Sequence, residues 1–227
     1  MTRQVHGTGP HETRACFEHA ASAFVSLVTG ISDDCWTAPA LGEWSVRDLV
    51  GHTSRALSTV ETYLGTPAGV VDAGAGAQTD RIDAVGYYLA VRSGDLAVRI
   101  GLADPAAVTQ RGRDAGAALG DDPSDAVTAL ANRVRELVRE SPDDAVVMTA
   151  LGAMRLADYL PTRTFELTVH TLDLARALDV PPPASLGTAI GGSLLLAAGI
   201  AAALPDAADI LLLLTGRADL PAALSVV

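Results

Sequence analysis

Apolar residues recur every three to four positions over several long stretches of this 227-residue chain. That period is typical of amphipathic helices, which turn one apolar face toward a core. It predicts helices over residues 11–29, 46–64, 80–102, 105–119, 124–140, 155–178 and 186–204, the third interrupted near Ser93 and Gly94. Stretches rich in glycine and proline separate these segments. The pattern therefore predicts a mainly α protein built as a helical bundle.

Local signals mark where two of these helices begin. Ser45 is followed three residues later by Asp48, just ahead of an apolar run. This is an N-terminal capping pattern, although Asp48 could instead be a salt-bridge partner. In the helix over 155–178, Pro161 leaves two starting points open, because proline is tolerated in a first turn and disrupts a helix interior. The helix begins either near Arg155 or just after Pro161.

Shorter apolar stretches predict a little β-structure. Residues 146–149 and 152–154 favour a hairpin around Ala150 and Leu151. Near the C-terminus, residues 210–214 favour a strand, with 224–227 as a partner strand. Three consecutive prolines end the preceding helix at 181–183. We therefore expect a helical bundle over residues 1–180 and a small C-terminal α/β extension over 181–227.

Composition narrows the classes of protein and partner. Hydrophobic residues make up 49% and charged residues 19% of the chain, which is typical of a globular protein with a sizeable core. The net charge of −11 argues against binding nucleic acid or an anionic membrane. Residues 186–204 are long enough to span a membrane, but four glycines and no flanking basic residues favour a buried helix of a soluble protein.

The N-terminus and the cysteines indicate a compartment. The first ten residues lack the hydrophobic segment of a signal peptide. Cys16 and Cys35 are the only cysteines and form no C-x-x-C motif, so reduced thiols are the expected state. Neither lies in an obviously electropositive setting, and we do not expect either to be a nucleophile. A cytoplasmic protein, monomer or homodimer, is the expectation.

Candidate chemistry centres on the helix over 155–178. Glu166 and His170 are four residues apart, so on a helix they share a face and present two potential metal ligands. His52, near the apolar face of the helix over 46–64, is a candidate third ligand. A His2Glu set with an open fourth position is typical of catalytic zinc, although manganese, nickel and iron accept the same donors. Spacing alone equally allows an ordinary surface pair and a hydrogen-bonded core histidine.

Two motifs resemble a known family. Residues 44–52, Trp-Ser-Val-Arg-Asp-Leu-Val-Gly-His, resemble the W-[ST]-V-R-D-L-V-x-H motif of mycothiol-dependent enzymes. Those enzymes are relatives of mycothiol-dependent maleylpyruvate isomerase in the DinB-like superfamily. Residues 163–174, with the pattern R-x-x-E-x-x-x-H-x-x-D-L, are similar to that family's second metal motif, and 214–217 with the closing Leu-Ser-Val-Val resemble its C-terminal segment. The resemblance implies a DinB-like four-helix bundle with zinc held by His52, Glu166 and His170.

The resemblance also implies roles for three further residues. Asp173 matches an acidic position that could orient a ligand imidazole or contact the thiol. Arg163, at the start of the second motif, is a candidate for binding the thiol or supporting a ligand. Arg217 matches an arginine that could reach the active site and bind an anionic substrate. Arg217 could equally be a turn residue that pairs with Asp219 or Asp206.

The activity implied is thiol transfer. Zinc would bind mycothiol as a thiolate, which attacks an electrophilic small molecule in detoxification or secondary-metabolite tailoring. One alternative is a cis–trans isomerase of the maleylpyruvate type, in which mycothiol is a regenerated cofactor. The isomerase carries a longer C-terminal α/β domain than residues 184–227 allow, which weighs against it. Another alternative is a non-catalytic metal-binding module. The partners expected are an electrophile and a low-molecular-weight thiol.

Overall fold

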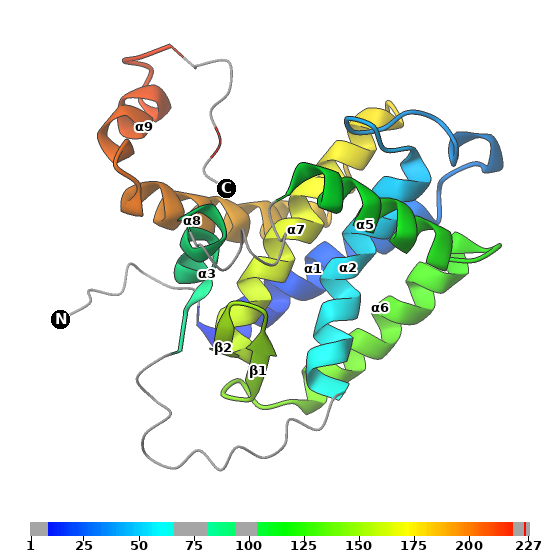
Figure 1. Cartoon of the computed structure of the whole chain (residues 1–227), viewed down its shortest axis with the longest axis horizontal. Helices are drawn as coiled ribbons and strands as arrows, with labels where there is room; N and C mark the ends of the chain where they lie inside the picture. The colour runs from blue at the N-terminus through cyan, green and yellow to red at the C-terminus, as the bar shows by residue number, and fades with distance from the viewer. Residues whose placement is uncertain (1–8, 66–80, 94–103, 220–224, 226–227) are drawn as a thin grey trace.

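Helices dominate the computed structural model, which describes residues 9–65, 81–93, 104–219 and 225. The helices are α1 (Pro10–Val28), α2 (Val46–Gly65), α3 (Ala84–Ser93), α5 (Pro105–Ala118), α6 (Pro123–Glu140), α7 (Leu156–Ala177), α8 (Leu186–Ala203) and α9 (Ala207–Leu214), with a short 3₁₀ turn at Asp33–Cys35 (Figure 1). The prediction of a mainly α fold is confirmed. The part of the third predicted helix beyond Ser93 lies outside the described residues as far as residue 103.

Four of these helices enclose the main core. Helix α1 packs on α6 and α7, and α2 packs on the same two helices from the other side. Their apolar stripes meet in the centre, where Phe17, Phe24, Leu49, Leu57 and Leu167 are fully buried. Each such side chain contributes roughly 1.5–3 kcal/mol through burial. The bundle therefore holds α2 and α7 in a fixed relation, and these are the helices that carry the two motifs.

The start of α2 is capped as its sequence predicts. The Ser45 amide and hydroxyl both donate to Asp48 Oδ2, at 3.0 and 2.7 Å. In return the Asp48 amide donates to Ser45 Oγ at 3.2 Å. Two backbone donors at the helix end are thus satisfied reciprocally, an arrangement that contributes about 1 kcal/mol.

Helix α5 lies directly on the backbone of α2. A Cβ atom built on Gly51 would come within 2.1 Å of the Gly116 nitrogen, and one built on Gly112 would come within 2.6 Å of the Trp44 ring. Trp44 Nε1 also donates to the Thr109 carbonyl at 2.9 Å. The missing side chains at these glycines let the two helices touch, which brings one face of α5 beside His52.

Helix α7 contains Pro161, so the earlier of the two predicted starting points is correct. It follows directly from a hairpin of β1 (Val146–Thr149) and β2 (Gly152–Arg155), which pair antiparallel as predicted. The hairpin and the first turn of α7 pack on the bundle through Val147, Met154 and Leu156, all fully buried. The start of α7, the helix that carries Glu166 and His170, is therefore anchored on the bundle.

The C-terminal segment corrects one prediction. Residues 210–214 were predicted as a strand but form part of α9. Leucine and alanine are strong helix formers, and a strand would need a partner to satisfy its backbone. The proposed partner over 224–227 lies outside the described residues apart from Ser225. The described part of the extension is helical, and its boundary at residue 180 stays a prediction.

Helix α8 is buried on one face only. It packs on α1 and α7 through residues such as Leu186, Ala189 and Ile200, whereas Leu194 and Leu195 are 65% and 56% exposed. Among the described residues it is the one helix long and apolar enough to cross a membrane by length and composition, and a third of it is buried. The prediction of a buried helix therefore holds for the side that faces α1 and α7.

Candidate metal centre

Helices α2 and α7 bring the predicted ligands together. His52 comes from α2, while Glu166 and His170 lie one turn apart on α7. One ligand-type atom from each residue lies within 4.8 Å of the other two. The two imidazole rings meet edge to face with their centroids 4.8 Å apart. Residues separated by more than a hundred positions in the sequence thus converge on one point.

The donor set fits a divalent metal ion. A tetrahedral ion with bonds of about 2.1 Å needs donors roughly 3.4 Å apart, which small side-chain movements would reach from this spacing. Nδ1 of His52 is buried and has no hydrogen-bond partner among the described residues. Burying an unsatisfied polar atom is costly, and such atoms in native proteins commonly mark a functional site. Trp44 packs on the His52 ring at 4.4 Å and limits its movement.

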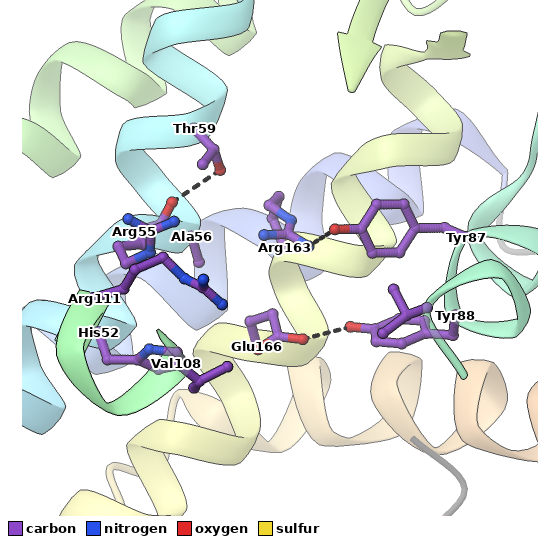
Figure 2. Close-up of a pocket in the computed structure, with 11 residues that line it drawn as sticks. His52, Arg55, Ala56, Thr59, Tyr87, Tyr88, Val108, Arg111, Arg163 and Glu166 are labelled. Atoms are coloured by element: carbon purple, nitrogen blue, oxygen red, sulfur yellow. Dashed lines mark hydrogen bonds between the residues drawn. The ribbon is translucent and has the colours of Figure 1, made fainter. Parts of the chain in front are cut away.

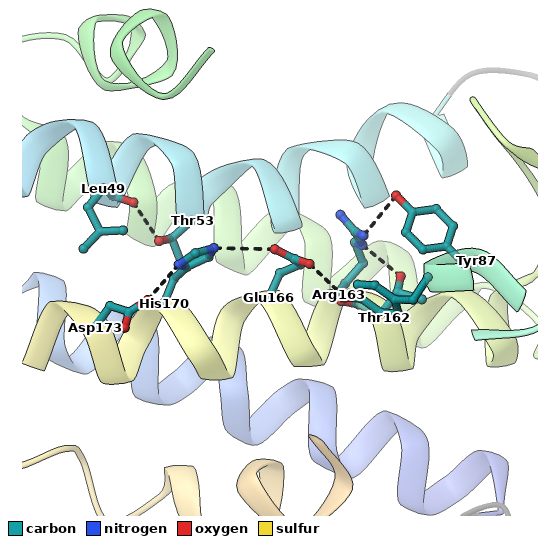
Figure 3. A network of polar contacts seen from close by, with 9 residues as sticks. Leu49, Thr53, Tyr87, Thr162, Arg163, Glu166, His170 and Asp173 are labelled. Carbon is teal, nitrogen blue, oxygen red and sulfur yellow. Dashed lines mark hydrogen bonds and ion pairs between the residues drawn. The ribbon is translucent and has the colours of Figure 1, made fainter. Parts of the chain in front are cut away.

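His170 is held between two carboxylates. Its Nδ1 donates to Asp173 Oδ2 at 3.1 Å, and its Nε2 lies 3.5 Å from Glu166 Oε2. Burial works against charging this ring, but the hydrogen bonds to Asp173 and Glu166 raise the pKa of His170 to about 9. A carboxylate on the second ring nitrogen is the usual support of a metal-binding histidine. Figure 3 shows these contacts along one face of α7.

Glu166 is kept ionised by its neighbours. Tyr88 on α3 donates to Glu166 Oε1 at 2.8 Å and to the Thr162 carbonyl at 3.2 Å. Burial alone would raise the pKa of Glu166, but the hydrogen bond from His170 and the charge of Arg163 lower it to about 2. Burial, reinforced by the charge of His170, lowers the pKa of His52 to about 4. A charged carboxylate and a neutral imidazole are the protonation states that metal ligands need.

A cavity of about 250 Å³ opens beside this group (Figure 2). His52 and Glu166 form part of its wall, together with three arginines, two tyrosines and smaller side chains: Arg55, Arg111, Arg163, Tyr87, Tyr88, Ala56, Thr59, Val91 and Val108. Arg55, Arg111 and Tyr88 were missed by sequence reasoning. Arg55 follows His52 by three residues on the same helix, so the sequence could have predicted that the two side chains share a helix face. Arg111 and Tyr88 had no such local signal.

The other predicted site residues lie in different places. Arg163 is buried in the cavity wall, where its guanidinium packs on the rings of Tyr87 and Tyr159, at 5.6 and 5.0 Å from their centroids. It donates to Thr162 Oγ1 at 3.0 Å. Arg217 is exposed in the turn after α9, where it donates to the Thr215 carbonyl, and it is not part of the cavity wall. Helix α9 lies on the side of α7 away from α5 (Figure 1).

A protein-family model matches most of the chain. The family model of the mycothiol maleylpyruvate isomerase N-terminal domain matches residues 17–175. The chain belongs to this family. The match includes all of α2 and most of α7, and so covers His52, Glu166 and His170, the candidate metal-binding triad; it ends before α8. No curated protein and no solved structure matches the chain. Membership of the mycothiol maleylpyruvate isomerase family confirms the resemblance of the two motifs and indicates a mycothiol-related activity.

Proposed function

We propose that the protein is a zinc-dependent mycothiol S-transferase that joins the thiol to an electrophilic small molecule. The observation that carries this proposal is the convergence of His52, Glu166 and His170 beside a cavity whose wall includes His52 and Glu166. Three protein donors leave a coordination position for a further ligand, as in catalytic rather than structural zinc sites. Family membership supports mycothiol as that ligand.

The chain's residues would prepare and support the site. When bound, the divalent ion supplies the positive charge that lowers the pKa of a coordinating thiol. Asp173 holds His170 in the tautomer that leaves Nε2 directed toward Glu166. Tyr88 fixes the Glu166 carboxylate through its hydroxyl. Wall side chains on α2, α3, α5 and α7 enclose the electrophile and orient its reacting carbon.

The bond changes in this proposal involve no protein nucleophile. In a displacement, the thiol proton leaves to solvent, a sulfur–carbon bond forms, and the leaving group departs with the electron pair of its bond to carbon. In the opening of an epoxide or an addition to a double bond, that electron pair stays on the co-substrate and takes up a proton from solvent. Cys16 lies in α1 against the Thr188 carbonyl, where burial raises the pKa of its thiol. Cys35 hydrogen-bonds with Ser32, and neither cysteine is part of the cavity wall. Both are free thiols, in keeping with the reduced cytoplasm that we propose as the location.

A second candidate is cis–trans isomerisation of the maleylpyruvate type, which the description of the matching family favours. The same triad would serve it, since the thiol would add to a double bond and leave again after rotation. The two reactions differ in their products. A transferase leaves a stable thioether, whereas an isomerase regenerates the thiol.

The test uses zinc-loaded protein, mycothiol and a panel of haloacetyl compounds, epoxides and α,β-unsaturated carbonyls, with products identified by mass spectrometry. We expect a thioether from the wild-type protein, and loss of both zinc and product in His52→Ala and His170→Ala. His19→Ala, at an exposed position on α1, is the matched control and should behave as wild type. Full zinc retention in both site variants would show that His52 and His170 are not zinc ligands. Conversion of maleylpyruvate without any thioether would favour the isomerase, and thiol binding without turnover would favour a non-catalytic module.

A further inference from the structure

The cavity wall carries an unbalanced charge. Three guanidinium groups, from Arg55, Arg111 and Arg163, line it, and Glu166 is the one acidic side chain in the described wall. Asp173 contacts His170 from outside this wall. A bound divalent ion would carry two positive charges, which a bound thiolate and Glu166 together would balance. The two neutral imidazoles would add no charge. The positive charge of Arg55 then remains, beside two further arginines.

The charge of Arg163 already has partners within the protein. Arg163 is buried, packs on two tyrosine rings and lies close enough to Glu166 for their charges to interact. Arg55 is different. It is partly buried, and its guanidinium makes no hydrogen bond or ion pair with any residue in the described ranges. Its charged neighbours in the wall are Arg111 and Arg163, both of the same sign.

Placing like charges together in a partly buried cavity is unfavourable unless an anion joins them. Figure 2 shows Arg55 and Arg111 on the His52 side of the cavity, with Glu166 across from them. Arg55 follows His52 by three residues, a rise of about 4.5 Å along α2. An anionic group held by Arg55 would therefore lie within a few bonds of an atom at the triad.

We propose that Arg55 and Arg111 bind an anionic group, of carboxylate chemistry, on the electrophilic co-substrate. The proposal rests on the transferase function and names its substrate class. The planar guanidinium fork matches the two oxygens of a carboxylate, which fixes both position and orientation. The co-substrate is thus a small acid whose reacting carbon lies close to its carboxylate. Neutral electrophiles of the same shape are poor substrates.

The first experiment compares two matched electrophiles, chloroacetate and chloroacetamide, with zinc-loaded protein and mycothiol. In both, the sulfur–carbon bond forms as the carbon–chlorine bond breaks and chloride leaves. Arg55→Gln should lower kcat/KM for chloroacetate by about tenfold or more, the usual effect of losing a charged hydrogen bond, and change the value for chloroacetamide less than about twofold. Arg55→Lys, which keeps the charge, should restore part of the loss.

Arg133→Gln is the matched control, because it removes the same charge from an exposed arginine of α6 that pairs with Glu61. It should leave both rates unchanged. Equal losses for the two electrophiles in Arg55→Gln, or a raised KM for mycothiol alone, would overturn the proposal and assign Arg55 to the thiol. If Arg55→Gln fails to fold by circular dichroism, Arg111→Gln takes its place with the same expected outcomes.

A second experiment needs no turnover. Zinc-loaded protein without thiol is titrated with benzenesulfonate, a weak metal ligand, and with methyl phenyl sulfone, its neutral analogue. We expect saturable binding of the sulfonate only, weakened about tenfold in Arg55→Gln and unchanged in Arg133→Gln. Equal binding of the sulfonate to wild type and Arg55→Gln would overturn the anion site. Retained anion binding in a protein that forms no thioether would count against the transferase function and leave the anion site standing.

Discussion

Asp173 Oδ2 accepts a hydrogen bond from Nδ1 of His170 at 3.1 Å, and this contact turns Nε2 of the same ring toward Glu166. The two residues are three apart on α7, so one turn of helix holds both the imidazole and its support. A ring fixed in this way would lose little rotamer freedom on binding a metal ion. The carboxylate also makes the ring nitrogen more basic, and so a stronger metal ligand.

Asp173→Asn tests this support. The amide keeps the size of the side chain but loses the charge, so we expect zinc affinity to fall about ten- to a hundredfold while the helix content stays the same. Competition with a fluorescent chelator measures the affinity. Asp179→Asn is the matched control, because Asp179 is exposed beyond α7 at a φ of 52° that asparagine also tolerates. Equal zinc affinity in wild type and Asp173→Asn would remove Asp173 from the site.

Tyr88→Phe tests the contact on the other side of the site. The ring would stay packed against Phe165, but Glu166 would lose the hydroxyl that donates to it at 2.8 Å. We expect unfolding to become easier by about 1 kcal/mol and zinc affinity to fall several-fold, since a ligand carboxylate would be less firmly oriented. Tyr63→Phe, a half-buried tyrosine on α2, is the control for stability alone. A drop in zinc affinity of the same size in both variants would contradict a specific role for Tyr88.

Gly51→Ala tests the contact between α2 and α5. Alanine favours a helix over glycine by about 1 kcal/mol, yet its Cβ would lie 2.1 Å from the Gly116 nitrogen. The helices must separate, so we expect a net loss of about 2 kcal/mol or more and a weaker anion site, because α5 carries Arg111. Thermal unfolding measures the first and benzenesulfonate titration the second. Gly187→Ala in α8, where nothing lies within 4 Å, should be neutral or slightly stabilising.

The pH dependence of zinc binding follows from His170. In the metal-free protein the pKa of His170 is about 9, so at pH 7 the ring is charged and must release a proton to bind an ion. With pKa values of about 4 and 2, His52 and Glu166 release none. Zinc affinity should therefore rise about tenfold per pH unit from pH 7 and level off above pH 9. Calorimetry in buffers of different ionisation enthalpy should report about one proton released per ion. Zinc binding without proton release would refute the assignment of that proton to His170.

Much of the fold could be predicted from the sequence, because its signals are local. Helical periodicity repeats every 3.6 residues, so the described helices other than α9, and the cap formed by Ser45 and Asp48, could be predicted from short stretches of sequence. The strand predicted over residues 210–214 was wrong because a run of leucines suits a helix as well as a strand, and only a partner decides between them. At the site, Glu166 and His170 could be paired because one helix carries both.

The relation between helices was decided by tertiary packing. His52 reaches Glu166 and His170 because α2 and α7 share the bundle core, a contact that family resemblance implied and spacing alone left open. Arg111 joins Arg55 because Gly51 and Gly116 let α5 touch α2, and Tyr88 reaches Glu166 because α3 packs on α7. Local periodicity sets which face of a helix a residue occupies, whereas the volumes of the packed side chains set which faces meet. The sequence alone therefore determined most of the elements and the candidate ligands, and the tertiary structure decided the C-terminal helix and the charged cavity beside the ligands.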